Sequence, residues 1–279
     1  MRLEGKPIAE SIKTRIKEKA LRLNRAPVLL TLSVAPNEAT FAYIRSQEKQ
    51  AKQLGITYRH ITFGREVTME RLLAEIDQIN RDEQTDAVLF FHPMPKHIDE
   101  LRLLTALSPE KDVEGRSPVN LGKLAYERAF LCPCTAEAVI AFIDYYRIPI
   151  QGERVAIVGR STTIGKPLSW MLLEKSRSAT PIVCHTKTKD LPEIIASSKV
   201  IVVATGVPEG LSLTGVPEGA FVIDVGINVV DGKVVGDVSL DPALETEKHI
   251  SITPTPGGVG PVTNLLLMEH AFVCALDPQ

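Results

Sequence analysis

The residues best suited to chemistry form a glycine-rich turn in the second half of the chain. An apolar stretch at residues 154–158 runs into Gly159, Arg160 and Ser161, and Gly165 then opens an amphipathic segment. A strand that turns through glycine into a helix offers backbone N–H groups and partial positive charge to a phosphate. Ser161 replaces the middle glycine of the G-x-G-x-x-G pattern, so a purely structural turn is the competing interpretation.

The end of the next apolar stretch distinguishes between the two nicotinamide dinucleotides. About 20 residues past the glycine turn, a site specific for NAD carries a carboxylate that binds the ribose. This sequence has His185, Thr186 and Lys187 there instead. Arg160, Thr186 and Lys187 offer a guanidinium, a hydroxyl and an ammonium to the additional 2′-phosphate of NADP, so we predict NADP rather than NAD. A solvated basic loop is the alternative.

Three more loops carry glycines at positions where a doubly wound sheet binds ligands. Thr205 and Gly206 follow one apolar stretch, Ile227 follows another, and a rigid segment at residues 253–263 precedes the last helical pattern. Each loop alone is compatible with a simple turn. Their order along the chain favours a binding edge built from successive strand ends.

The elements that must position these loops alternate between strand and helix patterns. We predict strands at residues 28–32, 57–63, 86–91, 154–158, 181–184, 200–204 and 221–225, and helices at residues 38–54, 69–80, 135–146 and 262–275. This alternation predicts an α/β protein with mostly parallel sheets. We expect a three-layer α/β domain at residues 1–147 and a Rossmann-like doubly wound domain at residues 148–261. The last helix, within residues 262–279, is expected to pack back on the first domain.

Composition narrows the class of partner. The chain has 279 residues, 44% of them hydrophobic, and a formal net charge of −2, which describes a soluble protein of two domains with small-molecule chemistry rather than nucleic-acid binding. It shows neither a signal peptide nor an uninterrupted apolar span, so we expect a cytoplasmic protein without membrane contact. Cys132 and Cys134 are one residue apart, which is unsuited to zinc, and no metal is expected.

The ordered motifs resemble the bifunctional methylenetetrahydrofolate dehydrogenase/cyclohydrolase family nearly from end to end. The motifs are Leu3-Glu4-Gly5-Lys6, Tyr43, residues 86–95, Lys111-Asp112-Val113-Glu114-Gly115, Asn120 with Gly122, Pro133-Cys134-Thr135, the glycine turn, residues 185–188, residues 224–228, residues 234–238 and residues 256–261. The resemblance implies a homodimer that binds folate in a cleft and NADP on the second domain, in one-carbon metabolism that serves purine biosynthesis.

Residue by residue, the resemblance implies two sets of contacts. The NADP set comprises Gly159, Arg160, Ser161, Ile164, Gly165, His185, Thr186, Lys187, Thr205, Gly206 and Ile227. The folate set comprises Tyr43, Phe91, His92, Pro93, Glu114, Pro256, Gly257 and Gly258.

The chain departs from the family in the catalytic tetrad of Tyr, Lys, Gln and Asp, where it has Tyr43, Gln47, Phe91 and Glu114. Gln47 lies one helical turn from Tyr43, so the geometry is kept while the titratable amine is lost. Hydride transfer needs no proton from the protein, whereas hydrolysis of the methenyl group does, and a positioned acid or base contributes about 10²–10⁴-fold. We take Tyr43, Gln47 and Glu114 as the candidate catalytic residues.

Three functions follow. The first is NADP-dependent oxidation of 5,10-methylenetetrahydrofolate to 5,10-methenyltetrahydrofolate, with weak or absent cyclohydrolase activity. The second is a fully bifunctional enzyme that uses Gln47, Glu114 or His92 in place of the lysine. The third is a paralogue that is non-catalytic or binds a different ligand.

Overall fold

The computed structural model describes residues 1–276, which form two compact units. Unit 1 contains Met1–Ser11, Leu124–Arg128 and Pro133–Thr263, and unit 2 contains Ile12–Lys123, Ala129–Cys132 and the described residues from Asn264 onward. Residues 133–147 therefore group by contacts with the later sheet, and the last helix contributes to both units. Positions 277–279 of the predicted C-terminal segment lie outside the described residues.

Unit 2 is built on a parallel sheet of three strands in the order β2-β1-β3. The strands are β1 (Val28–Val34), β2 (Thr57–Phe63) and β3 (Ala87–Phe90). All residues of β1 and β3 are buried, as expected of strands covered on both faces. Leu30, Leu32 and Phe90 form a core on one face with apolar residues of α3 and α4, while α2 packs along β2. The three predicted strands are confirmed, with end shifts in the first and third.

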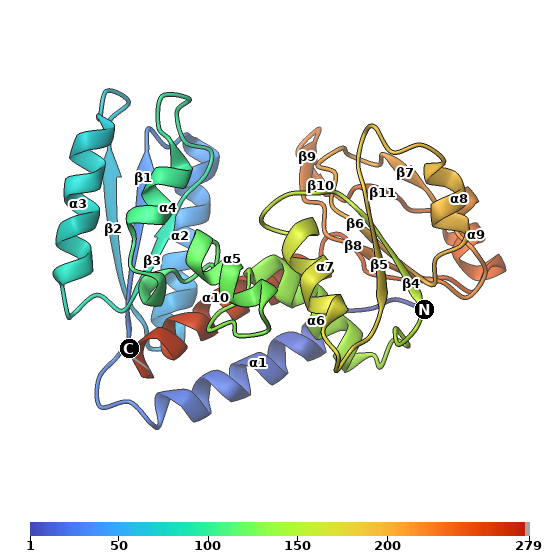
Figure 1. Ribbon diagram of the computed structural model, residues 1–279, viewed down its shortest axis with the longest axis horizontal. Helices are drawn as coiled ribbons and strands as arrows, with labels where there is room; N and C mark the ends of the chain where they lie inside the picture. Colours follow the sequence, from blue (N-terminus) through green and yellow to red (C-terminus); the bar gives the residue numbers. More distant parts are fainter. Residues whose placement is uncertain (277–279) are drawn as a thin grey trace. The chain divides into compact units, whose positions relative to one another are not determined.

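The helices of unit 2 follow the strands in alternation (Figure 1). They are α2 (Glu38–Gln53), α3 (Met69–Arg81), α4 (Glu100–Ala106), the 3-10 turn Pro109–Lys111 and α5 (Pro118–Ala125), whose last residues belong to unit 1. The side chain of Asn37 caps α2 through the N–H of Thr40, at 2.8 Å. Helical periodicity predicts α2 and α3 but not α4 or α5, which are too short for a clear period.

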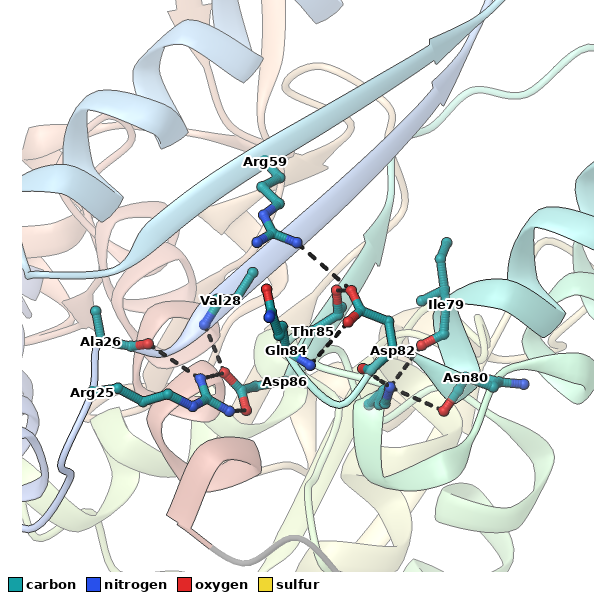
Figure 2. A network of polar contacts seen from close by, with 11 residues as sticks. Arg25, Ala26, Val28, Arg59, Ile79, Asn80, Asp82, Gln84, Thr85 and Asp86 are labelled. Atoms are coloured by element: carbon teal, nitrogen blue, oxygen red, sulfur yellow. Dashed lines mark hydrogen bonds and ion pairs between the residues drawn. The ribbon is translucent and has the colours of Figure 1, made fainter.

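Charged side chains fix the amino-terminal edge of this sheet (Figure 2). The Asp86 carboxylate accepts two hydrogen bonds of 2.6 Å from the Arg25 guanidinium and one of 2.7 Å from the N–H of Val28, which joins the starts of β1 and β3. The Lys111 ammonium closes the end of α3 by donating to the carbonyl groups of Ile79, Asn80 and Asp82, at 2.6, 3.1 and 2.8 Å. These contacts are structural, and the candidate site residues lie at the opposite, carboxyl ends of the strands.

Unit 1 contains a parallel five-stranded sheet in the order β12-β8-β6-β4-β5. The strands are β4 (Arg154–Val158), β5 (Thr180–Cys184), β6 (Val200–Val203), β8 (Phe221–Asp224) and β12 (Ser251–Ile252). After β5 the chain crosses back over β4 to β6, so the direction of winding reverses between β4 and β6. Ligands bind at such a reversal, outside the carboxyl ends of the strands. The predicted Rossmann-like doubly wound sheet is confirmed.

Helices cover both faces of this sheet, with α6 and α7 on one side and α8 and α9 on the other (Figure 1). They are α6 (Cys134–Tyr145), α7 (Gly165–Leu173), α8 (Leu191–Ala196) and α9 (Pro242–Glu247). Short elements complete the unit: β7 (Leu211–Ser212), the 3-10 turn Leu213–Gly215, β9 (Asn228–Val230), β10 (Lys233–Val235) and β11 (Val238–Ser239).

Two helices have residues in both units, α1 (Gly5–Ala20) and α10 (Val259–Leu276). The sequence pattern predicted α10 but did not reveal α1. By length and hydropathy alone α10 could span a membrane, but 61% of it is buried inside the protein. A core helix passes the same test, so α10 is weak evidence for a membrane segment.

Candidate active site

A pocket of about 450 Å³ lies at the winding reversal of the unit 1 sheet. Six residues of the predicted NADP set line it: Gly159, Arg160, Ser161, His185, Thr186 and Thr205. They come from the loops that follow β4, β5 and β6, so three strand ends meet at one opening. Among the described residues no carboxylate lines this pocket.

Close backbone packing explains the two glycines of the turn. Gly159 has a φ of 144°, and a Cβ there would collide with the carbonyl oxygen of Ala204. A Cβ on Gly165 would collide with the carbonyl oxygen of Gly159. The N–H of Ile164 donates to the Ser161 hydroxyl at 3.0 Å, which orders the turn just before α7. Both glycines are therefore required by close packing of the protein backbone within this turn.

The loop after β5 has its own internal hydrogen bonds. The N–H of His185 donates to the Thr188 hydroxyl at 2.8 Å, and the N–H of Lys187 donates to Nδ1 of His185 at 3.1 Å. Arg160, Thr186 and Lys187 are exposed at this end of the sheet. Thus two cations and a hydroxyl are available where an NAD-specific site would have an acidic side chain.

Two buried aspartates organise the loops around the pocket. Asp237 accepts hydrogen bonds from the N–H groups of Thr205 and Gly206, at 2.6 and 2.8 Å, and from the Asn228 amide at 2.8 Å. Asp224 accepts from the N–H groups of Gly226, Asp237 and Val238, at 2.9, 3.0 and 3.0 Å. Burial raises the pKa of Asp224, opposed by these donors. Sequence analysis used this segment only as a family motif and missed the role of Asp237.

A second hollow, of about 100 Å³, lies beside the loop that precedes α10. Ile227, Pro256, Gly257 and Gly258 line it together with Asp224 and Val234. Ile227 of the predicted NADP set therefore lies beside the unit 1 members of the predicted folate set. The N–H of Gly5 donates to the carbonyl of Gly257 at 2.9 Å and ties this loop to the start of α1.

In unit 2 the predicted folate residues gather at the carboxyl end of β3 and on α2. The Tyr43 and Phe91 rings meet edge to face, with centroids 5.8 Å apart, and Phe91 makes a similar contact with His60, also at 5.8 Å. The Tyr43 hydroxyl donates to Oδ1 of Asn264 on α10 at 2.6 Å. Tyr43 remains 43% exposed, so its ring is accessible to a ligand.

Gln47 has an unusual environment. It lies with Ile44 and Ala51 on the buried stripe of α2 and is 1% exposed. Within residues 1–276, neither its amide nitrogen nor its amide oxygen has a hydrogen-bond partner. A buried polar group without a partner costs about 1–3 kcal/mol, so this amide is a candidate ligand contact rather than a packing residue.

Glu114 belongs to a charged cluster that the sequence analysis did not find. Arg116 Nη1 lies 3.2 Å from Oε2 of Glu114 and 2.8 Å from Nε2 of His92, and Arg116 Nη2 lies 2.5 Å from Oε1 of Glu100. His92 Nδ1 lies 3.3 Å from Oε2 of Glu100. Burial raises the pKa of Glu114 to about 7, although Arg116 opposes the shift. Burial also lowers the pKa of His92.

The structure thus divides the predicted site residues by unit. Tyr43, Gln47, Phe91, His92 and Glu114 lie in unit 2, where Pro93 follows the cluster as an exposed residue of the loop. Pro256, Gly257, Gly258 and the whole NADP set lie in unit 1. Ile164, Gly165, Lys187 and Gly206 do not line the pocket itself but shape or flank its loops.

Comparison with known proteins covers both units. The profile of the tetrahydrofolate dehydrogenase/cyclohydrolase catalytic domain matches residues 3–114, and that of the NAD(P)-binding domain matches residues 133–277. A bifunctional protein FolD of Thermosipho africanus is 43% identical over 275 residues, which cover 99% of this chain and 98% of the relative. The chain belongs to the tetrahydrofolate dehydrogenase/cyclohydrolase family.

Solved structures of the family share the fold. The bifunctional FolD enzyme of Campylobacter jejuni has a TM-score of 0.93 and 35% identity, over 100% of this chain and 99% of that chain. The Trypanosoma brucei methylenetetrahydrofolate dehydrogenase-cyclohydrolase, complexed with NADP cofactor and an inhibitor, has a TM-score of 0.90 and 32% identity, over 99% and 97% of the two chains. The predicted family and fold class are therefore confirmed.

Proposed function

We propose that this protein is an NADP-dependent 5,10-methylenetetrahydrofolate dehydrogenase that has lost most or all cyclohydrolase activity. Family membership supports the folate substrate, and the loops around the unit 1 pocket support the cofactor. The proposed loss of cyclohydrolase activity rests on Gln47, whose neutral amide is buried and has no hydrogen-bond partner among residues 1–276.

The residues of the unit 1 pocket fit a dinucleotide. Gly159 and Gly165 allow the tight turn from β4 into α7, where N–H groups at the start of the helix favour a pyrophosphate. Arg160, Thr186 and Lys187 are exposed where the 2′-phosphate of NADP needs cations and hydrogen-bond donors. When bound, NADP supplies the hydride acceptor, and the protein supplies binding and orientation.

The two reactions of the family make different demands on the residue at position 47. Removal of a hydride from the one-carbon bridge creates a cation without transfer of a proton to the protein. A neutral amide suits this step, because an ammonium at the same place would repel the developing charge. Addition of water to the methenyl cation and opening of the ring require proton movements, and Gln47 has no titratable proton.

Turnover of 5,10-methylenetetrahydrofolate, followed by absorbance with NADP and then with NAD, tests this proposal. Hydrolysis of 5,10-methenyltetrahydrofolate is measured separately. We expect reduced NADP to form while the methenyl compound persists. A pH-dependent enzymatic hydrolysis would favour the bifunctional alternative, and NADP binding without folate turnover would favour a paralogue with another ligand.

Replacement of Arg160 by alanine, in combination with Lys187→Ala, is expected to raise the dissociation constant for NADP about tenfold or more. Loss of the two cations removes charge-assisted contacts to the 2′-phosphate, so the dissociation constant for NAD should change little. Lys189→Ala, which removes an exposed lysine just beyond this loop, is the matched control. Equal weakening of both cofactors would contradict the assignment of the basic loop.

We also propose a cytoplasmic homodimer whose interface includes the β9–β10 hairpin. Val229, Val230 and Val234 on this hairpin are 71%, 41% and 41% exposed, and adjacent exposed apolar residues favour burial in an interface. Val229→Asp is expected to convert the dimer to a monomer, which light scattering measures. Its affinity for NADP should equal that of the wild type. A dimer of unchanged stability would place the interface elsewhere.

A further inference from the structure

The cluster around Arg116 combines several charges that the proposed reaction does not explain. The side chains of Arg116, Glu114 and Glu100 are 11%, 21% and 34% exposed, so the guanidinium is the most buried of the three. Its Nε has no hydrogen-bond partner among the described residues. Arg116 contacts three side chains from three segments: His92 in the loop after β3, Glu100 at the start of α4, and Glu114 just after the 3-10 turn Pro109–Lys111.

The hydrogen-bond pattern fits a neutral histidine. Arg116 can only donate, so Nε2 of His92 accepts, and Nδ1 then carries the hydrogen that faces Glu100. With His92 neutral, one guanidinium faces the two carboxyl groups of Glu100 and Glu114. The cluster carries one excess negative charge whenever both are ionised, in agreement with the raised pKa of Glu114.

Glu114 is the member of the cluster that sequence analysis assigns to the folate. A carboxylate can accept hydrogen bonds from the amino and N–H groups along one edge of a pterin ring, whereas a protonated carboxyl group accepts them poorly. We infer that Arg116 is a positioning residue that orients Glu114 toward the pterin edge and favours its ionised form, through contacts shared with Glu100 and His92. This inference rests on the proposed function for its ligand class.

A dependence of folate binding on pH follows from this arrangement. The pKa of Glu114 is about 7, so binding that requires its ionised form should strengthen as the pH rises through neutrality. The charged groups that act on Glu114 are Arg116, which lowers its pKa, and Asp112 and Glu100, which raise it. Without Arg116 the pKa of Glu114 should rise further, and the binding transition should move to higher pH.

The test is calorimetric titration of the full-length protein with tetrahydrofolate, over a pH range that brackets neutrality. Arg116→Gln is expected to move the transition in tetrahydrofolate affinity upward by about 1 to 3 pH units, the usual effect of an arginine beside a carboxyl group. Arg116→Lys keeps the charge and should restore most of the wild-type profile. Glu114→Gln should abolish the transition.

Arg177→Gln is the matched control, because Arg177 is also a largely buried arginine that pairs with a carboxylate, Asp144, but lies in unit 1. Its pH profile should coincide with that of the wild type. A profile of Arg116→Gln that coincides with the wild type, or wild-type binding that does not vary with pH, would overturn the inference. Dehydrogenase turnover measured in parallel separates the proposals: pH-linked binding without turnover overturns the proposed function alone, and absence of tetrahydrofolate binding overturns both.

Discussion

Introduction of lysine at position 47, together with glutamine at position 91, is expected to raise the rate of 5,10-methenyltetrahydrofolate hydrolysis by about 10²–10⁴-fold. The buried stripe of α2 would place the new amine where Gln47 now lies, one turn from Tyr43. Desolvation at this position would lower the pKa of the lysine toward neutrality, which suits a group that must both donate and accept a proton. The new amide at position 91 would give the amine a hydrogen-bond partner.

Single substitutions separate the contributions of positions 47 and 91 to hydrolysis. Gln47→Lys alone should gain less, because Phe91 offers the ammonium no acceptor and already packs against Tyr43 and His60. Gln47→Met, similar in size but without a titratable group, should leave hydrolysis at the wild-type rate. Hydrolysis by the wild-type protein at the rate of the double variant would show that Gln47 does not mark a lost step.

Replacement of Asp237 by alanine should weaken NADP binding and stability more than any other single change in unit 1 considered above. The carboxylate is fully buried and accepts hydrogen bonds from two backbone N–H groups of the pocket loop and from the Asn228 amide. Its removal takes the acceptor from three partly buried hydrogen bonds to a charged group, at a total cost of about 3–5 kcal/mol. We expect a loss of this size in the free energy of unfolding and an NADP affinity at least about a hundredfold lower.

Asp241→Ala provides the matched control for this variant. Asp241 also accepts from two backbone N–H groups, those of Ala243 and Leu244, but it caps α9 away from the pocket lining. Loss of this cap should lower the free energy of unfolding, measured with urea, by about 1 kcal/mol and leave NADP affinity unchanged. Asp237→Asn keeps an acceptor, so its free energy of unfolding and its NADP affinity should lie between those of Asp237→Ala and Asp241→Ala. Equal NADP affinity in Asp237→Ala and the wild type would show that the loop holds its shape without the carboxylate.

The strand and the helix that flank the glycine turn could be predicted from the sequence because their determinants are local. Strand β4, the glycine turn and α7 follow one another directly, so periodicity and glycine spacing were enough to identify them. The strands at residues 57–63 and 154–158 agree with β2 and β4 at both ends. The short helices α8 and α9 were missed, since six residues hold less than two turns of a pattern.

Several contacts of the unit 2 site residues could not be predicted from the sequence because the partners are distant in the chain. Glu100 lies 16 positions before Arg116, and Asn264 lies 221 positions after Tyr43. Local patterns identify Glu114 and His92 as candidates but carry no information on which cation faces them. The burial that raises the pKa of Glu114 likewise depends on tertiary packing.

The discontinuous make-up of unit 2 also bears on how the chain folds during synthesis. Its last segment, from Asn264 onward, includes Glu269, which accepts from Arg15 and Lys19 of α1 at 2.6 to 2.9 Å, and His270, whose Nδ1 lies 2.9 Å from the Val113 carbonyl. These contacts join α10 to segments that precede it by 157 to 254 positions. Unit 2 can therefore be complete only after α10 has emerged from the ribosome, although domains of many proteins fold in turn as they emerge. The sheet of unit 2 is synthesised first, yet unit 2 must wait for a helix that follows the sheet of unit 1 in the chain.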